Sequence, residues 1–151
     1  MPKFDTRRRV RHRAEDMFEL VADVEKYPQF VPLCQSLSIR DRGVSESGYP
    51  ALIADMTVAY KFFRETFTSR AVLERDNLRI VAQYLDGPFS HMENIWTFTP
   101  AGDRACDVHF AIDYAFRSRP LEMLMGAMFD TAFRKFASAF EARADTIYGR
   151  A

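Results

Sequence analysis

Hydrophobic and polar residues alternate with a period of two through most of the chain, a pattern typical of β-strands with one buried face. The strands expected from it cover residues 3–10, 37–41, 50–60, 62–75, 78–85, 89–99 and 105–116. In the last of them, one face would carry Val108, Phe110, Ile112, Tyr114 and Phe116. Turn-forming residues separate the strands, and such short connections require antiparallel pairing.

Two stretches show helical spacing instead. A short helix is expected from Ala14 until Pro28 interrupts it, and residues 27–34 then form a second short helix or a turn. Pro120 opens a long helix that is expected to reach Tyr148, with Gly149 as its stop. Its predicted apolar stripe comprises Leu121, Leu124, Met125, Met128, Phe129, Ala132, Phe133, Phe136, Ala139, Phe140 and Ile147.

The order of these elements predicts an α+β fold. One strand, two short helices, six strands and a long helix give a single domain over residues 1–151, in which a curved antiparallel sheet of six or seven strands surrounds the C-terminal helix. Burying the helix stripe contributes on the order of 10 kcal/mol before entropy is subtracted, so the stripe must face the sheet. A bent sheet that closes on one helix often leaves an apolar space between them.

The composition of the chain supports an apolar interior space and limits the classes of partner that the protein could bind. The chain has fourteen Phe, six Tyr and one Trp, which indicates a packed interior, an apolar cavity or both. Lys plus Arg equals Asp plus Glu at 21 each, and this balance argues against a protein devoted to nucleic acid, DNA above all. There is no secretory signal and no apolar run of about twenty residues. We therefore expect a cytoplasmic protein, at most peripheral on the inner face of a membrane.

Candidate catalytic chemistry is sparse. No zinc motif, phosphate loop or nucleophile elbow occurs, so we predict no catalytic residue and no metal. His109 with Asp107, and His91 with Glu93, are interpreted as surface ion pairs on exposed strand faces. The thiols of Cys34 and Cys106 are expected to be free, Cys34 as a small buried hydrophobe in preference to a reactive thiol.

The run from Arg7 to Arg13 is the strongest charge feature. It is either a contact for RNA or anionic lipid, or a solvated strand whose arginines pair with acidic neighbours. Strand alternation would send Arg8 toward the interior, where it would need a polar partner.

Several short motifs together resemble a known family. They are Tyr27-Pro28-Gln29-Phe30-Val31-Pro32-Leu33-Cys34, Phe67 with Ser69, Gly87-Pro88-Phe89, Trp96-Thr97-Phe98-Thr99-Pro100, Asp113-Tyr114-Ala115-Phe116, Phe140-Glu141-Ala142-Arg143-Ala144 and Tyr148-Gly149. With them the chain resembles, over essentially its whole length, the coenzyme Q-binding START-domain family. That family also contains the bacterial ribosome association toxin and lies within the polyketide cyclase/dehydrase and lipid-transport superfamily.

The resemblance implies a helix-grip, START-like fold with an internal hydrophobic tunnel. It implies a ubiquinone-like prenylated quinone as bound ligand, without turnover and without a covalent cofactor, in support of respiration or quinone biosynthesis. One alternative is a ribosome-binding regulator that inhibits subunit association. Another is an aromatase/cyclase-type enzyme, for which Glu65 and Arg8 are the only inward acid or base candidates.

The inward faces and the resemblance together predict the site residues. The cavity is expected to be lined by Phe63, Phe67, Tyr84, Trp96, Phe98, Phe110, Tyr114, Met125, Phe129 and Phe133. Its mouth is expected at Val31, Pro32, Leu33, Gly87, Pro88 and Phe89. The turn at Phe89 would set an exposed aromatic ring there, and the ring N–H of Trp96 could donate to a quinone oxygen.

Overall fold

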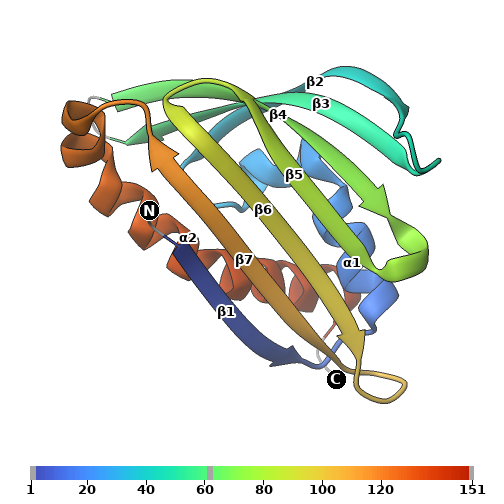
Figure 1. The fold of residues 1–151 in the computed structure, drawn as a ribbon. Coiled ribbons are helices and arrows are strands. Elements are labelled where there is room, and N and C mark those ends of the chain that lie inside the picture. Colours follow the sequence, from blue (N-terminus) through green and yellow to red (C-terminus); the bar gives the residue numbers. More distant parts are fainter. Residues whose placement is uncertain (1–2, 61–62, 150–151) are drawn as a thin grey trace.

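Seven strands form one antiparallel sheet in the computed structural model, which describes residues 3–60 and 63–149 (Figure 1). The strands are β1 (Lys3–Val10), β2 (Cys34–Val44), β3 (Pro50–Tyr60), β4 (Phe63–Glu74), β5 (Arg79–Asp86), β6 (Phe89–Pro100) and β7 (Cys106–Phe116). Their order across the sheet is β1-β7-β6-β5-β4-β3-β2, so β1 and β2 are the two edges. Every step between consecutive strands from β2 onward is a neighbour in the sheet, because short turns join antiparallel pairs.

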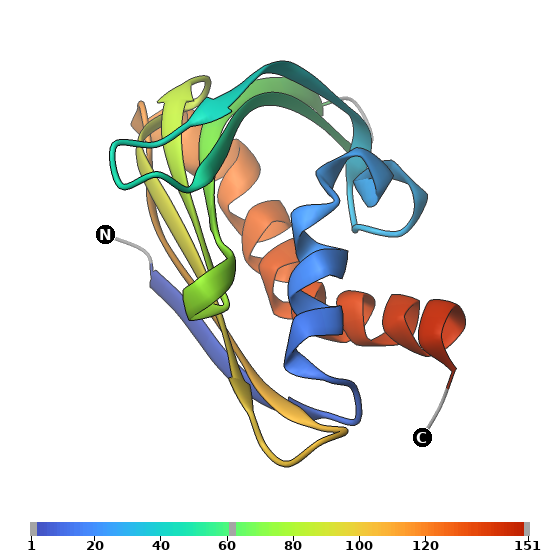
Figure 2. The ribbon, with the colours of Figure 1, turned by 90° about the vertical axis from the view of Figure 1, so that its right-hand side faces the viewer.

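The sheet bends around the long helix α2 (Arg119–Tyr148), as Figure 2 shows. Helix α1 (Ala14–Ala22) and the 3₁₀-helix η1 (Val24–Gln29) lie beside α2 and complete the enclosure, and a 3₁₀ turn, η2 (Arg75–Asn77), joins β4 to β5. The predicted α+β helix-grip fold is therefore confirmed. None of the helices in the described ranges combines the length and hydropathy of a membrane span.

Helix α2 begins and ends where local chemistry predicts. The hydroxyl of Ser118 accepts a hydrogen bond from the backbone N–H of Leu121 at 3.4 Å, and Pro120 occupies the first turn, where its missing N–H costs nothing. At the other end Gly149 has a φ of 84°, and its N–H donates to the carbonyl of Asp145. The sequence-based limits of this helix are therefore correct to within one residue.

Two other boundaries differ from the prediction. Helix α1 ends at Ala22, well before Pro28, and η1 follows as a separate 3₁₀ turn. Strand β2 runs over eleven residues, where only residues 37–41 were expected. Register shifts between Cys34 and Ser36, and between Ile39 and Asp41, interrupt its alternation, which explains why the pattern of period two is weak there.

The strand faces follow the alternation closely. Burial alternates residue by residue along the whole of β7, and its inward residues all belong to the core. The stripe of α2 is narrower than predicted: Met125, Phe129 and Phe133 are buried, but Leu124 is 56% exposed and Ile147 is 50% exposed. Leu124 is rotated by about 100° around the helix from Met125, beyond the arc that the sheet covers.

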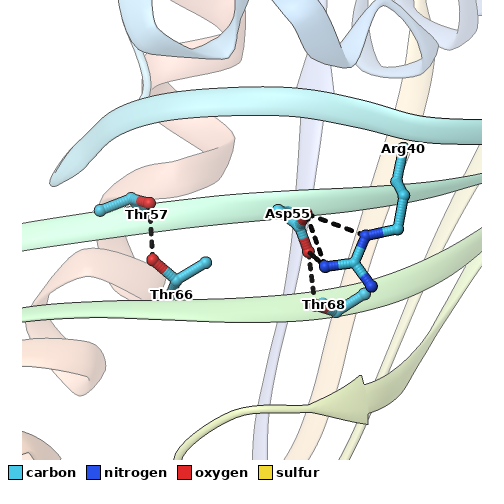
Figure 3. A network of polar contacts seen from close by, with 5 residues as sticks. All are labelled: Arg40, Asp55, Thr57, Thr66 and Thr68. Atoms are coloured by element: carbon cyan, nitrogen blue, oxygen red, sulfur yellow. Dashed lines mark hydrogen bonds and ion pairs between the residues drawn. The ribbon is translucent and has the colours of Figure 1, made fainter.

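Polar pairs on the convex face hold β2, β3 and β4 in register (Figure 3). The carboxylate of Asp55 accepts from the hydroxyl of Thr68 and, at 2.9–3.2 Å, from the guanidinium of Arg40, while the hydroxyls of Thr57 and Thr66 lie 2.8 Å apart. Since a slip of one residue would turn these side chains inward, the network also fixes which residues of β3 and β4 face the helix.

Candidate ligand-binding cavity

An apolar cavity of about 100 Å³ lies between the concave face of the sheet, α2 and the segment that leads into β2. Strands β2 to β7 supply Leu37, Leu52, Ala54, Met56, Val58, Phe67, Ser69, Ala71, Ile80, Ala82, Met92, Asn94, Trp96, Phe110 and Ile112. The helical side supplies Val24, Tyr27, Pro32, Leu33, Phe129, Ala132, Phe133, Phe136 and Phe140. Most small-molecule sites have roughly 300–1,000 Å³, so a large ligand requires the walls to move.

Small side chains in the middle of the sheet create this space. The strand register aligns Leu52, Ala71, Ala82 and Asn94 in one row across β3, β4, β5 and β6. The methyl groups of Ala71 and Ala82 are too short to fill the space below α2. In the adjacent row of inward residues, nearer α1, Trp96 and Phe110 are in contact, with ring centroids 4.7 Å apart. The cavity therefore lies where alanines interrupt an otherwise aromatic face.

The turn between β5 and β6 closes one end of the interior. A Cβ on Gly87, whose φ is 141°, would lie 2.6 Å from the Cβ of Phe67, so the turn packs directly on β4. Pro88 is fully buried, and Phe89 is only 2% exposed, in ring contact with Phe67 and Phe129. The prediction of an exposed aromatic ring at this turn is therefore wrong, because the close packing of the turn at Gly87 places the ring of Phe89 in the core.

The segment that leads into β2 borders the cavity on the other side. Pro32 and Leu33 line it, whereas Val31 is buried behind them. Leu33 adopts a φ of 67°, which is costly for a residue with a branched side chain. Its carbonyl accepts a hydrogen bond from the N–H of Ala59 at 3.0 Å, which ties the segment to β3.

Arg143 of α2 holds the same segment from the helix side. Its guanidinium donates to the side-chain oxygen of Gln29 at 2.6 Å and lies 5.2 Å from the ring centroid of Phe30. Phe30 in turn makes an edge contact with Phe140, one of the cavity residues, at 5.0 Å between centroids. The wall formed by η1 is thus packed onto α2 by aromatic and cation–π contacts.

Half of the predicted lining residues reach the cavity. Phe67, Trp96, Phe110, Phe129 and Phe133 line it. Phe98, Tyr84, Tyr114 and Met125 are not among the lining residues, and the side chain of Phe63 lies outside the described residues.

The four that do not reach it pack elsewhere in the interior. Phe98 contacts Phe18 of α1 at 6.1 Å between centroids, Tyr84 and Tyr114 pack against Phe89, and Met125 is buried on α2. The inward face was therefore predicted well, but the part of it that remains open was not.

The lining residues that were not predicted include large apolar side chains, such as Leu52, Ile80 and Phe140, and a set of small or polar ones. Ala54, Ser69, Ala71, Ala82 and Asn94 all occupy inward positions of predicted strands. Their signal was present, since each interrupts a run of large apolar residues at the alternating positions. A small residue at an inward position leaves volume unfilled, so such interruptions predict cavities as directly as aromatic residues predict cores.

The cavity carries no ionisable acid–base chemistry near neutral pH. None of its described lining residues is Asp, Glu, Lys, Arg, His or Cys, and no described group of such residues could hold a metal ion. Burial raises the pKa of Tyr27 well above its ordinary value, so its phenol stays neutral.

The two acid or base candidates named from the sequence do not reach the cavity. Arg8, predicted to point inward, is exposed, and its guanidinium donates a hydrogen bond to the carboxylate of Glu141 on α2 at 2.6 Å. Glu65 is not a lining residue.

The histidines pair with partners other than those predicted. His109 lies 2.9 Å from Asp5 on β1, and His91 lies 3.6 Å from Asp113 on β7. Both partners are diagonal neighbours on an adjacent strand, since the register sets Asp5 opposite Ala111 and Asp113 opposite Glu93, and diagonal neighbours lie within reach of long side chains. His12 is buried and lies 2.7 Å from Asp145, where it joins the start of α1 to the end of α2.

Both cysteines are free, as predicted, and both are buried, which was expected of Cys34. Burial raises the pKa of each thiol to about 11, so neither is a thiolate at neutral pH. Cys34 is consequently a small hydrophobe of the core.

Most of the arginine run is occupied by ion pairs on the surface. Arg9 makes two hydrogen bonds to Asp107, and Arg13 lies 3.2 Å from Glu15. Arg7 and Arg11 are exposed and have no ion pair within the described part of the chain. Two cations therefore remain available to a partner at this edge of the sheet.

Comparisons with known proteins agree with this architecture. The family model for "Polyketide cyclase / dehydrase and lipid transport" matches residues 10–141. The chain is 33% identical to the Ribosome association toxin RatA of Escherichia coli (strain K12) over 148 residues, which cover 98% of the chain and 90% of that protein.

Two further proteins extend the range of functions on this fold. The mitochondrial Coenzyme Q-binding protein COQ10 homolog B of Xenopus laevis is 30% identical over 143 residues, covering 90% of the chain but 55% of that protein. The Zhui aromatase/cyclase from Streptomyces sp. R1128 superposes with a TM-score of 0.83 over 95% of the chain and 93% of its own, at 17% identity. That low identity shows the shared fold alone.

Proposed function

Because the chain belongs to the polyketide cyclase / dehydrase and lipid transport family, we propose that it binds an apolar small molecule in the cavity and releases it unchanged. The observation that carries the proposal is the cavity wall of 24 residues, all apolar except for a few neutral polar groups. No carboxylate, imidazole, thiol or basic side chain occurs among its described lining residues, and the phenol of Tyr27 stays neutral, so the wall favours binding over proton transfer, and hence a carrier over a cyclase.

A prenylated quinone is the proposed ligand. Each buried methylene contributes roughly 0.8 kcal/mol, so a short prenyl chain supplies useful affinity while remaining exchangeable with a bilayer. The cavity in its present form is too small for a ring and a tail together. Met56 and Met92 in its wall are unbranched and adaptable, so their side chains can move to admit both.

Solvent extraction tests this ligand. The purified protein is extracted and the extract is analysed by mass spectrometry for prenylated quinones, and the ligand-free protein is then titrated with decylubiquinone. Trp96 is the chain's single tryptophan and lines the cavity, so quenching of its fluorescence reports occupancy. No quinone in the extract and no quenching at saturating decylubiquinone would reject the quinone.

A role in ribosome association is the second candidate, and the named relatives favour it over a role in respiration. The toxin of E. coli is matched over 90% of its length, against 55% of the coenzyme Q-binding protein. The exposed guanidiniums of Arg7 and Arg11 supply cations for RNA phosphates. Such a role would place the protein in the cytoplasm and does not compete with a ligand in the cavity.

Gradient sedimentation distinguishes this role. We expect salt-sensitive comigration with the large ribosomal subunit, weakened in the double variant Arg7→Gln, Arg11→Gln. Arg104→Gln is a matched control, because Arg104 is equally exposed but lies in the turn between β6 and β7. Comigration that is absent, or equally strong in both variants, would remove the arginine-based interaction.

A further inference from the structure

Two polar side chains interrupt the apolar floor of the cavity. Ser69 of β4 and Asn94 of β6 both line it from the concave face of the sheet. The side-chain amide of Asn94 donates to the backbone carbonyl of Ala111 at 2.9 Å. That bond uses one N–H, so the amide oxygen and the second N–H remain for another partner.

The strand register sets the distance between them. Ala82 of β5 stands directly beside Asn94, and Ala71 beside Ala82, while Ser69 lies two residues from Ala71 on the same face. With strands ~4.8 Å apart and ~3.4 Å per residue, the two Cα atoms are separated by roughly 12 Å. On β5 the space between them is bordered by Ala82, which offers only a methyl group, and by Tyr84, which stands opposite Ser69 but packs its ring against Phe89. Ala71 and Ala82 therefore leave room for a flat ring.

We infer that Ser69 and Asn94 form a polar subsite that binds oxygen substituents on opposite sides of an aromatic or quinonoid ring, with Ala71 and Ala82 beneath the ring. The inference rests on the proposed function and narrows its ligand class. Within the described residues neither the hydroxyl of Ser69 nor the amide oxygen of Asn94 has a hydrogen-bond partner. A ligand that satisfies them avoids leaving polar groups unpaired on burial, which a plain hydrocarbon cannot do.

Equilibrium dialysis with 2,6-dihydroxynaphthalene and with naphthalene tests the subsite, since the two probes differ only in the hydroxyl groups. We expect Ser69→Ala and Asn94→Leu each to weaken binding of the diol by about fivefold, the value of one ordinary hydrogen bond, and to leave naphthalene binding unchanged. Ser38→Ala makes the same change as Ser69→Ala at an exposed position of β2, opposite Asp55 on the convex face, and it should alter the binding of neither probe.

The outcomes separate the subsite from the cavity itself. If both probes bind and neither Ser69→Ala nor Asn94→Leu changes their affinity ratio, the subsite is refuted while apolar binding stands. If the unmodified protein binds neither probe, the subsite and the proposed function fail together. Unchanged naphthalene binding also shows that a variant is folded. If Asn94→Leu unfolds the chain, Ser69→Ala still tests the subsite, because the Ser69 hydroxyl makes no hydrogen bond within the described residues.

Discussion

Filling the cavity should stabilise the protein and abolish binding. Ala82 stands between Ala71 and Asn94 in the floor of the cavity, so Ala82→Leu would place three more carbon atoms in its space of about 100 Å³. At roughly 0.8 kcal/mol per buried carbon group, the gain is about 2 kcal/mol if no neighbour is displaced. For a chain of this size the melting temperature should rise by roughly 4–8 °C.

The assay combines unfolding in urea with the quenching of Trp96 by decylubiquinone. Ala111→Leu is the matched control, because Ala111 lies on the convex face opposite Ile95 and the same enlargement there fills no cavity. Overpacking a filled core costs about 1–3 kcal/mol. A loss of stability of that size in Ala82→Leu would mean that the space between sheet and helix does not exist, and undiminished quenching would place the ligand elsewhere.

Three further outcomes follow from the fold. Gly87→Ala should cost about 1–3 kcal/mol in urea unfolding, because its φ is positive and the new Cβ would meet Phe67; no loss would show that the turn does not pack there. A hydrogen bond from a hydroxyl and a guanidinium neighbour lower the pKa of Asp55, so its stabilisation is present above the unfolded pKa of about 3.9 and is lost as the pH falls through the lower folded pKa. The free energy of unfolding should therefore drop below pH 4 less steeply in Asp55→Asn than in the unmodified protein, and equal slopes would contradict this. Cys34 and Cys106 should react with a disulfide reagent at pH 8 only as fast as the protein opens, whereas rapid labelling of the folded protein would contradict their raised pKa.

The sequence predicted which residues of the last two strands, β6 and β7, face inward. Inward positions on β7 and β6 were assigned correctly, because alternation depends only on the geometry of a single strand. It also predicted the ends of α2, where Ser118, Pro120 and Gly149 act within one turn. Ion pairs were predicted poorly: His109 contacts a residue 104 positions away, which no local pattern could indicate.

The sequence by itself thus determined which side chains face inward. Only the tertiary structure decided which residues each of those side chains contacts. Trp96 and Phe98 share one face of β6, yet Trp96 lines the cavity while Phe98 packs against Phe18 of α1. The direction of a side chain follows from the backbone of its own strand, whereas its surroundings depend on where helices distant in sequence cross the sheet. A cavity is a property of several elements at once, and it becomes visible only when all of them are in place.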